Sequence, residues 1–129
     1  MNLLEYLQIQ IIAKSQEKVT LSMKIEECHK QPYGIMHGGV NGVLIETACS
    51  LGANEHLSPK EAYSVGVDLQ VNHLKSVSSG ELIVIATPDH VGRSIQVWKA
   101  DIYDEKNHLI SVGRCTLMNQ LITKTNQTD

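Results

Sequence analysis

Alternating polar and apolar residues mark five strand-like segments along the chain. Between residues 18 and 26 the two classes alternate, which is typical of a strand with one buried face. Turn-forming sequences separate the strand-like segments of the second half of the chain, at residues 78–80, 91–93 and 105–107. We expect these short connections to join antiparallel hairpins. The remaining strand-like segments are rich in Val and Ile or alternate in the same way, and they span residues 63–73, 81–88, 94–103 and 109–121.

A long helix is predicted from about His37 to His56, after a turn at residues 31–34 and before a break at Ser58-Pro59. A helix that is apolar nearly all round is buried or lies at an interface. The pattern therefore predicts an α+β domain, in which a curved antiparallel sheet wraps the helix and a second copy of the chain covers its far side. The apolar positions form one stripe of Val40, Val43, Leu44, Thr47, Ala48 and Leu51, with Ile45, Cys49 and Ala53 roughly opposite.

The two ends of the chain are expected to be accessory to this domain. Leucines at residues 3, 4 and 7 and isoleucine at residue 11 fall at helical spacing, so we expect a helical segment over residues 1–16. This segment lacks the basic run and the cleavage site of a secretory signal. No stretch of the chain approaches the ~20 apolar residues of a membrane span. We expect a cytoplasmic protein with a single domain over residues 1–129, ending in a flexible tail over residues 121–129.

Composition narrows the possible functions. A chain of 129 residues with 42% hydrophobic content suits one domain, and its formal charge of −3 argues against nucleic-acid binding. Three cysteines without metal-ligand spacing fit reduced thiols that act as small core residues. The six histidines are scattered, and no catalytic triad, P-loop or dinucleotide fingerprint is present. We therefore expect no metal and no cofactor.

Glu46 is the one charged residue between Gly38 and Asn54 on the predicted helix. Removing a carboxylate from water without a partner costs several kcal/mol. Such a residue is either paired for structural reasons or kept for its chemistry. The sequence immediately before the helix favours chemistry.

Several ordered motifs carry a resemblance to a known family. The series resembles the hotdog-fold acyl-CoA thioesterases, and most of all the bacterial enzymes of the phenylacetate and menaquinone pathways that act on aromatic acyl-CoA. Ile45 and Cys49 depart from the family pattern, which often has Ala and Gly there. The likeness covers about residues 18–120, and the motifs are QPYGIMHGG at 31–39, ETACSLG at 46–52, and residues 71–76, 90–98 and 103–106.

The resemblance implies hydrolysis of an acyl-CoA thioester to a free acid and coenzyme A, which is then part of the substrate. Glu46 can serve as general base or as nucleophile, and the sequence does not choose between these roles. The backbone N–H of Gly38 can stabilise the oxyanion, because the first N–H groups of a helix lack internal partners. In the family, the residues matching His37 and Gln31 help to hold the thioester carbonyl or water.

Structural alternatives remain open for these residues. His37 could be a helix N-cap, and Gln31 could simply form the turn. The Ser50 hydroxyl, one turn after Glu46, could bond the carboxylate or the attacking water, or the carbonyl of residue 46. Glu46 itself could form a structural salt bridge.

The spacing of Gly38 and Glu46 predicts an oligomer. Eight residues on one helix separate the two groups axially by roughly 12 Å, so they cannot meet at one thioester carbonyl within one chain. We therefore expect Gly38 of one subunit to work with Glu46 of another, the two long helices running antiparallel across a two-fold axis. The resemblance implies the same arrangement, a homodimer or a homotetramer formed from two dimers.

Two segments suit the phosphates and pantetheine arm of coenzyme A. Each combines cationic or polar side chains with a strand end or a tight turn, and the matching family segments line that channel. Solvated surface residues are the alternative for both. The candidate substrate-binding residues are Asn72, His73, Lys75 and Ser76 in the first segment, and Gly92, Arg93 and Ser94 in the second.

Two rival functions remain. One is a non-enzymatic acyl-CoA-binding module, and the other is a hotdog dehydratase that acts on a 3-hydroxyacyl thioester, since residues 42–46 are similar to the helix of fatty-acid dehydratases. The Gly38-Gly39 pair after His37 argues against the dehydratase. The acyl group, expected to be aromatic or of medium length, is not determined by the sequence.

Overall fold

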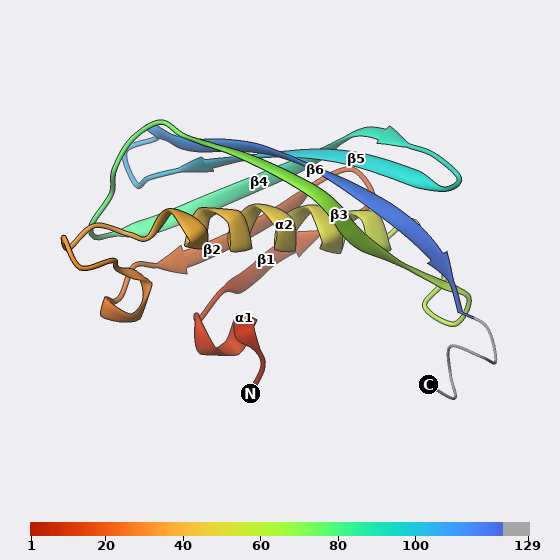
Figure 1. Ribbon diagram of the computed structural model, residues 1–129, viewed down its shortest axis with the longest axis horizontal. Helices are drawn as coiled ribbons and strands as arrows, with labels where there is room; N and C mark the ends of the chain where they lie inside the picture. Colours follow the sequence, from red (N-terminus) through yellow and green to blue (C-terminus); the bar gives the residue numbers. More distant parts are fainter. Residues whose placement is uncertain (123–129) are drawn as a thin grey trace.

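One curved antiparallel sheet wraps around a single long helix in the computed structural model, which describes residues 1–122 (Figure 1). The helix α2 (Gly38–Asn54) lies inside the curve, and a short helix α1 (Leu3–Tyr6) lies near the N-terminus. A 3₁₀ turn (Glu27–His29) follows the second strand. The strands are β1 (Gln10–Lys14), β2 (Val19–Lys24), β3 (Ala62–His73), β4 (Glu81–Val91), β5 (Ile95–Tyr103) and β6 (Leu109–Leu121).

The strand order in the sheet is β1-β2-β4-β5-β6-β3, and all neighbours are antiparallel. Hairpins join β4 to β5 and β5 to β6, as the sequence predicted. The predicted hairpin between β3 and β4 is wrong, because β3 pairs with β6 at the edge of the sheet. Residues 74–80 instead cross the end of the sheet. Seven extended residues span about 23 Å, which exceeds the roughly 14 Å of three strand spacings, so a short connection does not require a hairpin.

The N-terminal segment differs from its prediction. Residues 1–16 are not helical throughout, because α1 ends at Tyr6 and residues 10–14 form β1 on the edge of β2. Gln8, with a φ of 59°, turns the chain between them. Pairing satisfies backbone groups that β2 would otherwise leave open at the sheet edge, and this outweighs the helical spacing of Ile11. The predicted tail over residues 121–129 begins too early, because Leu121 is the last residue of β6 and pairs with Ala62. Residues 123–129 of that tail lie outside the described residues.

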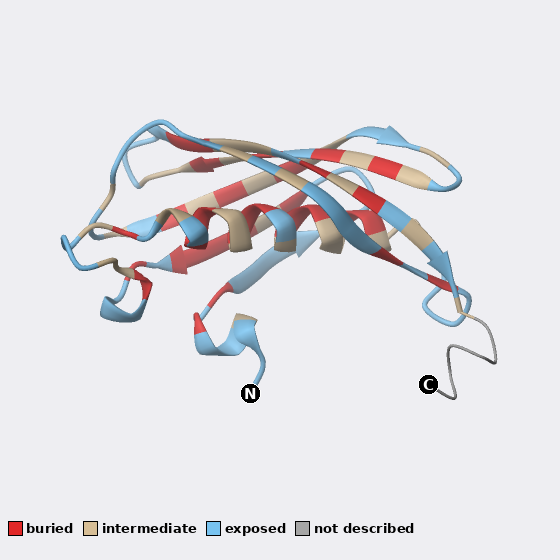
Figure 2. Ribbon diagram, in the orientation of Figure 1, coloured by how far each residue is buried: buried red, intermediate tan, exposed pale blue. Residues whose placement is uncertain are grey.

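Side chains from α2 and from the concave side of the sheet form the core (Figure 2). The close approach of the helix depends on Gly52, where a Cβ would overlap the ring of the fully buried Trp98. The outward face carries the exposed Glu46, so the helix is not apolar and buried all round within one protomer. The buried residues of the helix are Val40, Asn41, Leu44, Ile45, Ala48, Cys49, Gly52 and Ala53.

A buried histidine fastens the N-terminal segment to the body. His29 is fully buried; its Nδ1 accepts from the Glu26 N–H and its Nε2 donates to the Leu7 carbonyl, both at 2.8 Å. These bonds hold the end of α1 against the turn that precedes α2. In the part of the chain that the structure describes, no helix is long and apolar enough to span a bilayer.

Candidate active site

The start of α2 presents an unpaired backbone N–H. His37 is the N-cap, and its Nδ1 accepts a hydrogen bond of 2.8 Å from the Gly39 N–H. The N–H of Val40 donates to the His37 carbonyl. Within residues 1–122, the Gly38 N–H has no such acceptor. His37 therefore caps the helix, which was the structural alternative considered for it. This cap does not use the Gly38 N–H, which stays available for a ligand.

Two imidazoles bracket the glycine pair. A Cβ at Gly38 would lie 2.9 Å from His73 Nε2, and a Cβ at Gly39 would lie 2.9 Å from His37 Nδ1. Contacts this close exclude any side chain unless a ring moves. The Gly-Gly sequence thus permits both rings to lie against the helix start, where an approaching carbonyl would find the backbone N–H.

A pocket of about 300 Å³, here called the Gly38 pocket, opens at this end of the helix. It brings together several residues singled out from the sequence, and it includes the buried Asn41, which the sequence analysis missed. Gln31 Oε1 accepts from the Tyr33 N–H, so this side chain also has the turn-forming role considered for it. The pocket is lined by Gln31, Ile35, Met36, Gly38, Asn41, His73, Leu74, Lys75, Ser76 and Val77.

Glu46 lies in a second, larger pocket of about 640 Å³, here called the Glu46 pocket. Its carboxylate lies above the β3 backbone, where a Cβ at Gly66 would be 2.8 Å from Oε2. No cation within residues 1–122 forms an ion pair with Glu46, which gives the salt-bridge alternative no support in the protomer. The pocket is lined by Leu3, Leu4, Gly39, Gly42, Val43, Glu46, Thr47, Ser50, Leu51 and Leu69.

Ser50 lies beside Glu46 in this pocket, but within residues 1–122 its hydroxyl bonds neither the Glu46 carboxylate nor the carbonyl of residue 46. The hydroxyl instead accepts a bond of 3.4 Å from Asn54 Nδ2, which also donates to the Ser50 carbonyl. This contact fixes the C-terminal turn of α2 next to the acid.

The thiols near Glu46 are held in their neutral form. Burial, with a smaller contribution from the negative charges of Glu46 and Asp68, raises the pKa of Cys115 to about 12. Burial raises the pKa of Cys49 as well, with Cys115 and Glu46 adding to it. Neither thiol is a nucleophile at neutral pH. Both fill the core as predicted, whereas Cys28 is exposed and contradicts that prediction.

Gly38 and Glu46 occupy separate pockets of the same protomer. Gly38 begins α2 and Glu46 follows two turns later, as their spacing predicted. The roughly 12 Å of helix between them keeps the Glu46 carboxylate and the Gly38 N–H apart. In one protomer the two groups therefore do not meet in one pocket.

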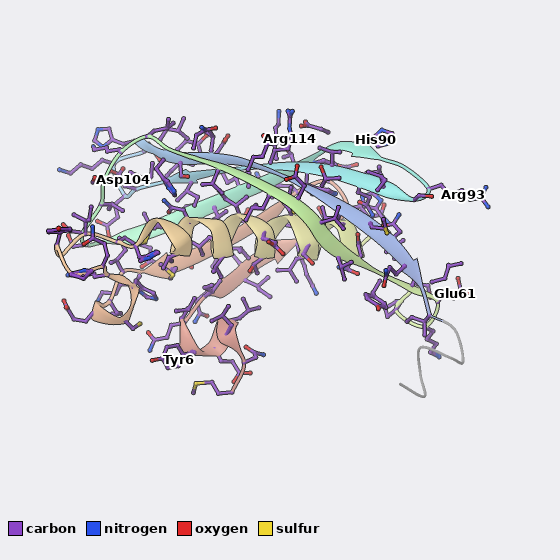
Figure 3. All side chains as sticks on the ribbon, in the orientation of Figure 1. Tyr6, Glu61, His90, Arg93, Asp104 and Arg114 are labelled. Carbon is purple, nitrogen blue, oxygen red and sulfur yellow. The ribbon has the colours of Figure 1, made fainter. Side chains whose placement is uncertain are left out.

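The segments expected to contact coenzyme A also lie apart. Side chains alternate along β3, so His73 lines the Gly38 pocket whereas Asn72 faces a polar depression on the outer side of the sheet with Arg114. The turn that contains Gly92, Arg93 and Ser94 lies at the far end of the sheet, which Figure 3 shows from the positions of Arg93 and Asp104.

Lys75 is already engaged at the surface. Its Nζ lies 3.0 Å from His108 Nδ1 and 3.9 Å from Asp104 Oδ2. Desolvation raises the pKa of Asp104, but hydrogen bonds from His108 and the Lys106 N–H outweigh it and hold this pKa below 3.8. An anionic ligand at Lys75 would compete with an ionised carboxylate.

Asn41 and Gly66 could have been found by closer reading. Asn41 is a second strongly polar residue in the apolar first half of the helix, and Gly66 interrupts a Val-rich strand, which is a signal for a bulge or a close approach. Among residues 1–122, no three His, Cys, Asp or Glu side chains are grouped so that they could hold a metal ion.

Comparisons with known proteins identify the family to which this fold belongs. The family model of the thioesterase superfamily matches residues 33–111. The 1,4-dihydroxy-2-naphthoyl-CoA hydrolase of Listeria monocytogenes is 37% identical over 117 residues, covering 91% of this chain and 94% of that protein. A thioesterase structure from Haemophilus influenzae superposes with a TM-score of 0.88 at 37% identity, over 94% of this chain and 84% of that one. The structure of a variant of a Staphylococcus aureus thioesterase superposes with a TM-score of 0.90 at 32% identity, over 93% of this chain and 99% of that one.

The chain therefore belongs to the thioesterase superfamily and has its hotdog fold. It is a thioester hydrolase, and the family supports an acyl-CoA thioester as the substrate. These relatives favour the hydrolase over the acyl-CoA-binding module and over the dehydratase.

Proposed function

We propose that the protein hydrolyses an aromatic or medium-chain acyl-CoA at sites shared between subunits. In each site, Glu46 of one subunit acts as general base or nucleophile, and the Gly38 N–H of its partner stabilises the oxyanion. The observation that carries this proposal is the division of the protomer into two half-sites, one with the acid and one with the unpaired N–H.

The position of Glu46 supports its catalytic assignment. It lacks a cationic partner in the described protomer, and apolar side chains surround it. Covering this pocket with a second chain would remove water and strengthen the basicity of the carboxylate. Ser50, on the same face one turn later, is placed to orient water in such a covered site. His37 and Gln31 are proposed to help hold the carbonyl at the Gly38 end.

The edge of the sheet supports pairing with a second copy. β3 is a twelve-residue edge strand that leaves one side of its backbone open, and Val67 on it is 54% exposed. Long, exposed apolar edge strands are templates for further strand pairing. Glu46 lies against this strand at Gly66, so a partner that extended the sheet here would also cover the acid.

The acyl group is proposed to lie in the Glu46 pocket. Leu4, Val43, Leu51 and Leu69 give it an apolar wall, which suits a ring or a chain of medium length. Coenzyme A contacts are proposed for His73, Lys75 and Ser76. Asn72 and the turn at residues 92–94 can contact the same coenzyme only from another subunit.

The first experiment is Glu46→Gln, which keeps size and removes the base. The variant should fold normally because the side chain is exposed in the protomer. Its kcat, followed by thiol release from benzoyl-CoA and hexanoyl-CoA, should fall by roughly 10²–10⁴-fold. Undiminished kcat in a folded variant would refute the assignment of Glu46.

The second experiment tests sharing between subunits. A Glu46→Ala chain is mixed with a Gly38→Pro chain, which lacks the N–H at a helix position that tolerates proline. Heterodimers should regain activity, because one of their two sites combines an intact Glu46 with an intact Gly38. Gly38→Ala is the matched control, since it retains the N–H but also places a Cβ near His73. Verified heterodimers without recovered activity would count against a shared site.

A further inference from the structure

Asn41 lies on the sheet-facing side of α2 with only half of its amide satisfied. The residue is 5% exposed, and its Nδ2 lies 3.0 Å from His73 Nδ1. Its Oδ1 is buried, and it has no hydrogen-bond partner among the residues that the structure describes. Asn41 lines the Gly38 pocket, one helical turn after Gly38.

The contact between Asn41 and His73 determines where the imidazole carries its proton. In this orientation of the amide, Asn41 Nδ2 donates and His73 Nδ1 accepts, which places the ring proton of the neutral imidazole on Nε2. Nε2 is the ring atom nearest to Gly38, 2.9 Å from the position of a Cβ there. Two hydrogen-bond donors consequently lie together in the Gly38 pocket, the Gly38 backbone N–H and the His73 Nε2–H.

We propose that Asn41 is a positioning residue, which holds His73 in the Nε2–H tautomer so that Nε2–H donates to the thioester carbonyl oxygen beside the Gly38 N–H. This inference rests on the proposed function of the Gly38 pocket. It adds a specific residue, Asn41, and a specific task, the choice of tautomer, to that pocket.

A comparison within the same helix argues against a purely structural role. Asn54, near the other end of α2, uses both ends of its amide: Oδ1 accepts from the Ser64 N–H at 2.8 Å, and Nδ2 donates to the carbonyls of Ser50 and Ser64. Asn41 leaves a buried oxygen unpaired, which costs stability that an apolar residue of similar size would not incur. Asn41 is thus poorly explained by the stability of the fold.

The cap at His37 provides a parallel. His37 Nδ1 accepts from the Gly39 N–H, so a neutral His37 also carries its proton on Nε2. One ring is oriented by a backbone donor and the other by the Asn41 amide. Of the two rings, His73 lines the Gly38 pocket and places its Nε2 beside Gly38.

The test is Asn41→Leu in the full-length protein, with Asn54→Leu as the stability control. Asn41→Leu should keep or raise the unfolding midpoint, because it removes an unpaired polar atom, whereas Asn54→Leu should lower it. In Asn41→Leu, kcat should fall about 10- to 100-fold with little change in KM, because one oxyanion donor is no longer held in place. A lowered midpoint with unchanged kcat would show a structural role and overturn the proposal.

Long-range ¹H–¹⁵N spectra of the His73 ring supply a readout that is independent of activity. The wild type should show the Nε2–H tautomer, and Asn41→Leu should show a mixture of the two. A wild-type ring with its proton on Nδ1 would overturn the proposal, even if Glu46→Gln abolished turnover as expected. Conversely, an active Glu46→Gln variant would contradict the proposed function without changing these spectra.

A double-mutant cycle provides the last arm. His73→Gln replaces the ring by a donor without tautomers, so adding Asn41→Leu to it should cause little further loss of kcat. If the two losses multiply in full, Asn41 does not act through His73.

Discussion

Gly66 occupies the point where β3 passes beneath the Glu46 carboxylate. A bulge interrupts the pairing of β3 with β6 between Gly66 and Asp68, and a Cβ at Gly66 would lie 2.8 Å from Oε2 and 3.1 Å from Cδ of Glu46. Those atoms end a flexible side chain, which can move at little cost. Adding a methyl group here should therefore displace the acid without unfolding the sheet.

We expect Gly66→Ala to retain its unfolding midpoint while kcat falls about tenfold, because small misplacements of a catalytic group are costly. Circular dichroism melts and thiol release from acyl-CoA measure the two quantities. In the Glu46→Gln background, the same substitution should change nothing further. An additional loss there would mean that Gly66 acts by another route.

At the residue scale, the sequence singled out Glu46 because a lone acid in an apolar helix is conspicuous, and the structure places it in the larger of the two pockets. The sequence did not predict that Glu46 is exposed in the protomer, since helical spacing alone does not show which side of a helix faces the sheet. The partnership of Asn41 with His73 joins residues 32 positions apart and depends on the pairing of β3.

The short helix α1 contributes to the site although it is only four residues long. Leu3 and Leu4 line the Glu46 pocket, and the buried His29 holds the end of the helix through the Leu7 carbonyl. α1 thereby forms part of the wall of the pocket in which we propose that the acyl group lies. Tyr6 on the same helix is 60% exposed and is absent from this lining, which makes it a matched control.

Replacing both leucines by serine should lower kcat/KM for hexanoyl-CoA by about tenfold or more, since each lost apolar contact weakens binding by ~1–3 kcal/mol. Acetyl-CoA, which has almost no chain to place, should respond much less. A panel of acyl-CoA substrates measures this, with Tyr6→Ser expected to match the wild type. Equal losses for all chain lengths would contradict the acyl-wall assignment.

At the element scale, periodicity located α2 and most strand boundaries because their patterns are local. The errors came from long-range pairing. Residues 10–14 form a strand that pairs with β2, and β3 pairs with β6 instead of with β4, its expected neighbour. Neither pairing can be predicted from the spacing of polar and apolar residues, since both depend on which edge of the sheet is unpaired.

Acid stability is a property of the whole molecule in which Asp104 has an identifiable part. Because hydrogen bonds hold the pKa of Asp104 below its ordinary value, its carboxylate stabilises the fold above the unfolded-state pKa, and this contribution is lost as the pH falls through the folded-state pKa. Asp104→Asn should lower the unfolding midpoint at neutral pH and flatten its decline toward acid. Melting curves across this range measure both effects. Parallel curves for wild type and variant would contradict the assignment.

The separation of Gly38 from Glu46 is a feature of the whole protomer. The sequence predicted the separation of Gly38 and Glu46 from helix geometry alone, and the structure places them in different pockets. It could not predict that residues 72–76 and 92–94 lie at opposite ends of the sheet, because the crossing of residues 74–80 decides that arrangement.

That crossing also bears on the order in which the molecule assembles. Hairpin turns join β4, β5 and β6, whereas β3 is an edge strand whose only neighbour within residues 1–122, β6, lies far along the chain. β3 carries Gly66 beneath the Glu46 carboxylate and His73 beside the helix start. We therefore expect mild denaturant to release β3 and abolish turnover while the buried Trp98 on β5 still reports an intact core.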